Sequence, residues 1–183
     1  MAKRIAFVVG STRRGSFNLQ LATIAEGMLE GRADVVYIDP APLPFVNQDI
    51  ESPAPELVKN ARDIVMSSDA LWIFTPEYNQ SIPGILKNLL DWLSRPLDPS
   101  DPDRKTAIKG KKVIISGAGG GKRTQFCRKA LFDLLSFIGA EVLDEEGRGF
   151  ALDRRAFTEN IWEPDESVIS DLREQADILM KSV

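Results

Sequence analysis

Short apolar runs alternate with longer segments of helical periodicity along this chain, and that alternation is the feature that most constrains its fold. The first run, residues 5–9 (IAFVV), is continuously apolar and ends at Gly10, which is typical of a strand buried on both faces. In the segment that follows, apolar residues recur at helical spacing up to a stop at Gly31. The chain therefore begins as a strand, a loop and a helix.

The same unit recurs to the end of the chain. Strands are predicted at 5–9, 35–38, 70–75, 112–116 and 141–143, and helices from about residue 18 to Gly31, at 57–66, after Gly84, at 126–138 and at 165–181. This alternation predicts an α/β protein, with one five-stranded parallel sheet covered by helices on both faces, a three-layer sandwich. Right-handed crossovers at this size favour the strand order 2-1-3-4-5. In that order a crevice opens where the loops after strands one and three meet.

Composition excludes several classes of chemistry. The 183 residues fit a single domain, 1–183, and the balance of 23 basic and 27 acidic residues argues against a nucleic-acid partner. The chain has no histidine, which excludes His-dependent triads and His-containing zinc sites. Its one cysteine excludes an internal disulfide and a multi-cysteine metal centre, so no metal site is predicted. The apolar runs are too short for a membrane span or a signal-peptide core, so we expect a cytoplasmic protein with no membrane partner.

The loop after the first strand is unusually polar. Residues 10–18 (GSTRRGSFN) lie between a strand and a helix N-terminus, whose free N–H groups and dipole can hold a phosphate. The side chains that could add hydrogen bonds or charge are Ser11, Arg13, Ser16 and Asn18. The alternative is a serine-rich turn with a single N-cap residue, because helix caps prefer the same residue types. The loop matches neither G-x-G-x-x-G nor the Walker A pattern.

The loop after the third strand, residues 76–84 (PEYNQSIPG), has the groups that a flat heterocycle would need. Two prolines stiffen it, Tyr78 can stack, and Asn79 and the backbone amides can pair with ring heteroatoms. The alternative is a surface loop in which Asn79 or Ser81 caps the next helix. That alternative does not explain a large aromatic side chain in an otherwise polar loop at the crevice.

The loop after the fourth strand, residues 116–124, is rich in glycine but is not a Walker A loop. Ser116 stands where that pattern requires glycine, and Lys122 is followed by Arg123. We expect this loop to form a wall of the crevice through close approach of its backbone.

Together these loops resemble a known family. Residues 10–18, written G-S-x-R-x-x-S-F-N, and residues 76–88, written P-E-Y-N-x-S-I-P-G-x-L-K-N and followed by Asp91-Trp92, are similar to the NADPH-dependent FMN reductase family. This family includes flavodoxin-like quinone, chromate and azo-dye reductases. The resemblance runs from about residue 3 to 142 and its second motif is highly specific. It implies a flavodoxin-like fold, FMN as cofactor and NADPH or NADH as electron donor.

The resemblance also implies which residues form the site. The phosphate and ribityl chain of FMN would be held by Ser11, Arg13, Ser16, Phe17 and Asn18. The isoalloxazine would be lined by Pro76, Glu77, Tyr78 and Asn79, with Ser81 and Ile82 nearby and with Ser116 and Gly117 closing the far side. Gln80 stands where a smaller residue or glycine is expected. Residues 144–164 match nothing in the family, so no function is carried onto them.

The function implied is an NAD(P)H-dependent oxidoreductase that passes a hydride through N5 of FMN to quinones or similar small acceptors with ping-pong kinetics. No catalytic protein residue is nominated, and Glu77 is expected to make helix or subunit contacts. One alternative is a flavodoxin-type electron carrier that does not oxidise NAD(P)H, although such carriers are typically more acidic than a net charge of −4. Another is a regulatory interaction protein that uses the fold with flavin as a sensor or without it.

The resemblance further implies a homodimer or homotetramer with the flavin near a subunit interface. Trp92, Leu93 and the proline-rich loop 96–103 could form part of that interface, or Trp92 could belong to the core of the chain. Cys127 lies on the apolar face of its helix and is expected to be a core thiol rather than a redox group.

Overall fold

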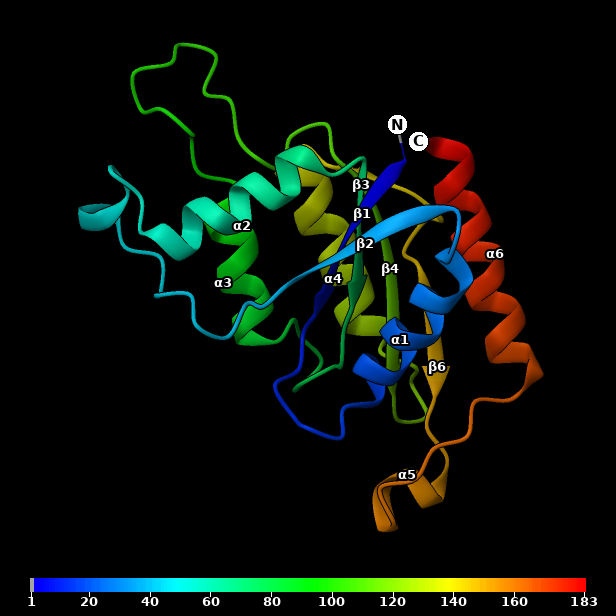
Figure 1. The fold of residues 1–183 in the computed structure, drawn as a ribbon. Coiled ribbons are helices and arrows are strands. Elements are labelled where there is room, and N and C mark those ends of the chain that lie inside the picture. Colours follow the sequence, from blue (N-terminus) through cyan, green and yellow to red (C-terminus); the bar gives the residue numbers. More distant parts are fainter. Residues whose placement is uncertain (1) are drawn as a thin grey trace.

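The computed structural model describes residues 2–183 and contains the predicted parallel sheet with helices on both sides (Figure 1). The strands are β1 (Lys3–Val9), β2 (Ala33–Ile38), β3 (Ala70–Phe74), β4 (Lys112–Gly119), β5 (Glu141–Val142) and β6 (Arg148–Ala151). The helices are α1 (Phe17–Leu29), η1 (Gln48–Ile50, a short 3-10 helix), α2 (Glu56–Ser67), α3 (Gly84–Leu93), α4 (Gln125–Phe137), α5 (Arg154–Thr158) and α6 (Glu166–Ser182). The order β2-β1-β3-β4-β5 confirms the predicted order 2-1-3-4-5.

Alternate side chains of the central strands enter two hydrophobic cores, one on each face of the sheet. Ile5 and Phe7 pack with residues of α1 and α6, whereas Ala6 and Val8 pack with residues of α2, α3 and α4. Figure 1 shows the same division of the helices between the two faces. Because both faces are covered, a ligand site has to lie at the ends of the strands, where the loops meet.

The fifth position of the sheet is shared by two short strands. β5 pairs with the beginning of β4, and β6 pairs with its end at Ser116–Gly119, both in parallel. The single fifth strand predicted at 141–143 is therefore only the first part of this edge. The sequence gives little signal for β6, because its four residues (RGFA) include a glycine and only one buried side chain, Phe150.

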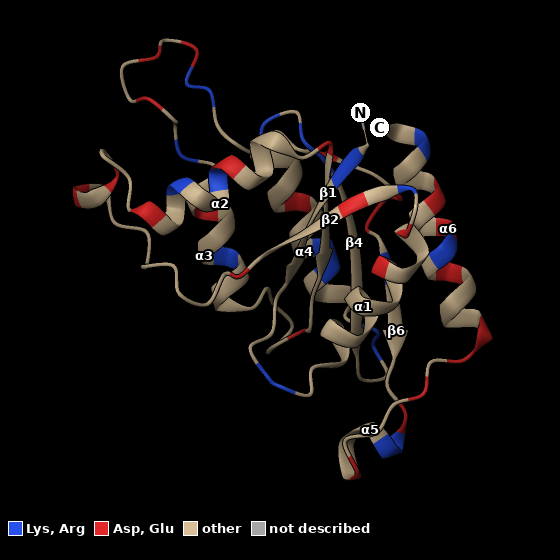
Figure 2. Ribbon diagram, viewed as in Figure 1, with Lys and Arg blue, Asp and Glu red and all other residues tan. Residues whose placement is uncertain are grey.

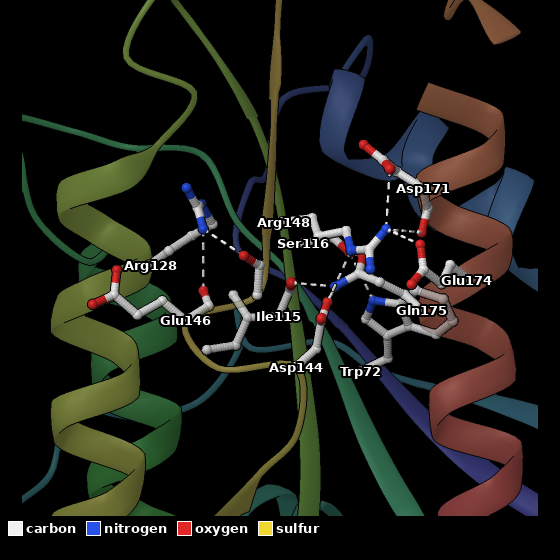
Figure 3. A network of polar contacts seen from close by, with 11 residues as sticks. Trp72, Ile115, Ser116, Arg128, Asp144, Glu146, Arg148, Asp171, Glu174 and Gln175 are labelled. Carbon is white, nitrogen blue, oxygen red and sulfur yellow. Dashed lines mark hydrogen bonds and ion pairs between the residues drawn. The ribbon is translucent and has the colours of Figure 1, made fainter. Parts of the chain in front are cut away.

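A network of polar contacts holds the two parts of this edge to β4 and α6 (Figure 3). Gln175 of α6 donates from Nε2 to the carbonyl of Ile115 at 2.9 Å and to Asp144 at 3.0 Å, and its Oε1 accepts from Ser116 at 2.5 Å. Arg148 of β6 pairs with the same Asp144 at 3.1 Å. Between β5 and β6 the backbone leaves the sheet, so side chains supply hydrogen bonds that a continuous strand would have made.

The structure assigns Trp92 to the core of the chain, which was one of the two alternatives. Its side chain is 1% exposed, and its Nε1 donates to the carbonyl of Pro44 at 2.7 Å. Leu93 is fully buried beside it, whereas the following proline-rich loop extends away from the body of the protein (Figure 1). Among residues 2–183, no helix has the length and apolar character needed to cross a lipid bilayer.

Candidate functional site

A cavity of about 560 Å³ opens at the carboxyl ends of β1, β3 and β4, where the strand order predicts a crevice. This volume lies in the usual range for sites that bind small ligands and cofactors. Eight of the predicted site residues line it: Ser11, Arg13, Ser16, Phe17, Asn18, Pro76, Glu77 and Tyr78. The other walls come from the end of β4 and from the segment that follows β6.

Ser16 lines the cavity and caps helix α1. Its Oγ accepts a hydrogen bond from the backbone N–H of Leu19 at 3.3 Å. A hydroxyl that accepts in this way keeps its own hydrogen free to donate. Within residues 2–183, the backbone N–H groups of Phe17 and Asn18 have no acceptor. The helix cap and the phosphate site, proposed from the sequence as alternatives, are therefore compatible.

Asn18 has a different principal role from the predicted phosphate contact. Its Oδ1 accepts from the backbone N–H of Ala118 at 2.8 Å, and its Nδ2 donates to the Ala118 carbonyl at 3.1 Å. These bonds are buried and leave only one N–H of the amide unused. Asn18 thus holds α1 against the end of β4 and fixes the distance between two walls of the cavity.

Arg13 is the arginine that lines the cavity. Its guanidinium carbon lies 4.7 Å from the centroid of the Phe17 ring, which is the arrangement of a cation–π contact. Its Nη1 donates to Oδ1 of Asn160, from the segment after α5. The charge is therefore held at the cavity wall by contacts on two sides.

Tyr78 reaches the cavity from a short hairpin. Its backbone N–H and carbonyl exchange hydrogen bonds with Ser81 at 3.3 and 3.0 Å, and the two residues between, Asn79 and Gln80, have φ values of 52° and 60°. Two-residue turns of this type require left-handed residues, which explains the expectation of glycine at position 80. Asn79, Ser81 and Ile82 do not line the cavity, because the turn carries the chain away from it.

Glu77 joins the loop after β3 to the start of α4. Its Oε2 accepts from the backbone N–H groups of Phe126 and Cys127, both at 2.9 Å, at the start of α4. Thr124, the N-cap residue of that helix, makes no side-chain cap bond, so Glu77 caps the helix from a distant part of the chain. This is the helix contact predicted for Glu77, and it occupies one oxygen of the carboxylate.

The wall formed by the fourth strand lies further along the chain than predicted. β4 continues to Gly119, so Ser116 and Gly117 belong to the sheet and not to a loop. Ser116 is fully buried, where it accepts from the indole of Trp72 at 2.9 Å and donates to Gln175. Ala118, Gly119 and Gly120 line the cavity in their place.

Cys127, near the start of α4, is fully buried with its Sγ 3.4 Å from Oγ1 of Thr75. Burial raises the pKa of the thiol to about 11. The thiol therefore stays protonated at neutral pH, as expected of a core residue rather than a redox group.

The sequence did not predict the wall formed by the segment after β6. Leu152, Ala156, Phe157 and Asn160 line the cavity, and all four lie in the segment to which no function was assigned. The available signal was weak: Asp153 is an N-cap residue before a helix of only five residues. Figure 2 shows basic residues on the β1–α1 loop and at the start of α5.

The groups around the cavity fit a flavin mononucleotide. The lining includes a helix N-terminus, two serine hydroxyls and a guanidinium, which suit a phosphate. It also includes the Tyr78 ring, Pro76 and a wall of alanine and glycine, which suit a flat ring system approached by backbone.

Comparison with known proteins agrees with this chemistry. The model of the NADPH-dependent FMN reductase family matches residues 3–151. A 2-hydroxy-1,4-benzoquinone reductase from Burkholderia is 46% identical over 96 residues, which are 52% of each chain. An NADPH:quinone oxidoreductase from Arabidopsis thaliana is 32% identical over 163 residues, covering 79% of this chain and 80% of the relative. The matched part of this chain covers 60% to 63% of the length of three other curated relatives.

Solved structures of flavin-binding proteins superpose on nearly the whole chain. A flavoenzyme NAD(P)H:(acceptor) oxidoreductase from Paracoccus denitrificans superposes with a TM-score of 0.84 at 28% identity, covering 98% of this chain and 96% of that one. An archaeal flavodoxin superposes with a TM-score of 0.59 at 13% identity, covering 98% of both chains, which confirms the flavodoxin-like fold. On the family match and these relatives, the chain belongs to the NADPH-dependent FMN reductase family.

Proposed function

We propose that this protein is an NAD(P)H-dependent oxidoreductase that binds FMN in the cavity described above and reduces quinones or similarly flat electron acceptors. The observation that carries the proposal is that one cavity is lined both by the N-terminus of α1, with its unpaired N–H groups, and by the aromatic ring of Tyr78. Membership of the family supports the choice of FMN and NAD(P)H. The names of the quinone reductases among its relatives support the class of acceptor.

The protein's part in the reaction is to bind, orient and shield. Ser11, Ser16 and Arg13 would hold the phosphate together with the first turn of α1, and Pro76 and Tyr78 would line the ring. The chemistry that the bound cofactor supplies is acceptance of a hydride from a nicotinamide and delivery of electrons to a second substrate. No protein acid or base is needed for this, and Glu77 is already engaged in capping α4. Donor and acceptor would use the same cavity in turn, so we expect ping-pong kinetics.

Absorbance spectra of the purified protein test the proposal. They are recorded with and without added FMN, and then after anaerobic addition of NADPH or NADH. A flavin spectrum that bleaches rapidly supports the reductase. Bound flavin that neither nucleotide reduces points to an electron carrier instead, and failure to bind flavin refutes the assignment of the cavity. The cytoplasmic location and the homo-oligomeric state stay predictions.

A further inference from the structure

The segment after β6 packs closely against the loop that would hold the phosphate. Residues 152–162 run beneath the N-terminal end of α1 (Figure 1) and lie beyond the part of the chain that the family model matches. Trp162 anchors the end of this segment: it is 6% exposed, and its carbonyl accepts from Nε2 of Gln20 in α1 at 3.0 Å. Its ring meets the Phe17 ring edge-on, with centroids 6.0 Å apart.

Asn160 is the residue of this segment that contacts the charged group. Its Oδ1 accepts from Nη1 of Arg13, whose guanidinium rests on the ring of Phe17. Asn160 and Arg13 both line the cavity. The Arg13 side chain, which begins in an exposed loop, is therefore fixed by an aromatic face on one side and an amide on the other.

The fit between the loop and Asn160 is close. A Cβ added at Gly15 would lie 2.7 Å from Nδ2 of Asn160, nearer than a side chain normally approaches. Asn160 has a φ of 56°, a conformation that asparagine tolerates better than most residues. A side chain at position 15 would therefore have to displace the Asn160 amide from its place beside Arg13.

The neutrality of Asn160 matters to what Arg13 can do. An amide oxygen orients a guanidinium without cancelling its charge, whereas a carboxylate at this position would form an ion pair and repel a phosphate. A long arginine side chain that is already ordered loses less conformational freedom when it binds a ligand.

We propose that Asn160 is a positioning residue that holds the guanidinium of Arg13 ready for the phosphate of FMN, so that a segment outside the family match sets how tightly the cofactor is retained. The proposal rests on the proposed function. Replacing Asn160 should weaken FMN binding about three- to tenfold, the effect expected from leaving one long side chain to be ordered on binding. It should not change the binding of riboflavin, which has the same ring system and no phosphate.

The experiment measures dissociation constants of FMN and riboflavin by quenching of flavin fluorescence, on protein freed of bound flavin. Asn160→Gly removes the amide and keeps a residue that accepts a positive φ without strain. Arg104→Gly is the matched control, because Arg104 also has a positive φ (47°) and does not line the cavity. We expect Asn160→Gly to weaken FMN binding and Arg104→Gly to leave it unchanged, with riboflavin binding unchanged in both. Asn160→Asp should lose the most FMN binding, because a carboxylate there would pair with Arg13 and repel the phosphate.

Two further variants separate positioning from packing. In an Arg13→Ala background, Asn160→Gly should have no additional effect on FMN. Gly15→Ala should weaken FMN binding by displacing Asn160, and this loss should not add to that of Asn160→Gly. Equal losses for FMN and riboflavin, or a full Asn160→Gly effect without Arg13, would refute the proposal. If the parent binds neither flavin, the proposed function itself fails, and with it this inference.

Discussion

Glu77→Ala should reveal whether this carboxylate supports the structure or takes part in the chemistry. In the structure its Oε2 accepts two backbone N–H groups of α4 at 2.9 Å. Loss of a helix cap is worth about 1–2 kcal/mol, and hydrogen bonds to a charged group contribute about 1.5–3 kcal/mol. Because Glu77 is only partly buried, water can replace some of this, so we expect a loss of about 2 kcal/mol in the free energy of unfolding.

Thermal unfolding converts this loss into a measurable shift. For a protein of this size, each kcal/mol corresponds to about 2–4 °C in Tm, so Glu77→Ala should melt about 4–8 °C below the parent. Glu77→Gln keeps an acceptor oxygen and loses only the charge at the helix N-terminus, which is worth about 0.3–1 kcal/mol. Its Tm should therefore fall by no more than about 4 °C.

Asp133→Asn is the control for this series. Asp133 lies in α4, the helix that Glu77 caps, and both side chains of its ion pair with Lys129 (3.1 Å) are exposed. It should change the free energy of unfolding by less than about 1 kcal/mol. The reasoning is refuted if Glu77→Ala melts like the parent. If it keeps the parent Tm and binds FMN but is no longer reduced by NADPH, Glu77 takes part in the reaction with NADPH instead.

Three other perturbations test separate features of the site. Gln80→Gly relieves a left-handed residue in the hairpin turn and should stabilise the protein by about 0.5–1 kcal/mol, measured by urea unfolding. Gly117→Ala places a Cβ 2.8 Å from the carbonyl oxygen of Thr75 and should lower the free energy of unfolding by about 1–3 kcal/mol. Gly121→Ala, in the next loop and with no atom within 4 Å, should leave it nearly unchanged; similar losses in both variants would contradict the close-packing argument. The raised pKa of Cys127, about 11, keeps its thiol protonated, so alkylation at pH 8 should be slow in the native protein and rapid in denaturant. Rapid native labelling would show that the thiol is accessible.

The central sheet could be predicted because its strands carry a local signal. Ile5–Val8 and Ala70–Phe74 are buried throughout, and strands buried on both faces appear in the sequence as unbroken apolar runs. The strand order then followed from general rules of handedness and size. The loops after β1 and β3 could be predicted as parts of the site because strand order alone places them together.

The β6 half of the fifth strand position, and the cavity wall that follows it, lacked such a signal, because distant residues determine them. β6 contributes one buried residue, and what fixes it is a set of side chains from other elements (Figure 3). Arg128 of α4, for example, donates to the carbonyl of Gly147 at 2.6 Å. Contacts of this kind leave no periodic pattern in the segment that they stabilise.

The alternatives left open at the first loop show why residue types alone could not separate a helix cap from a ligand site. Ser16 accepts from Leu19 through a lone pair and keeps its hydroxyl hydrogen for a second partner. Asn18, two positions later, uses both its oxygen and one N–H in hydrogen bonds to Ala118. This polar side chain therefore supports the cavity wall. A serine can therefore cap and bind at once, whereas this asparagine has one donor left for a ligand. It follows that Ser16→Ala should weaken FMN binding directly, while Asn18→Ala should act mainly by loosening α1 from β4. Comparing the loss of FMN binding with the loss of stability in the two variants distinguishes these roles, and equal ratios would contradict the distinction.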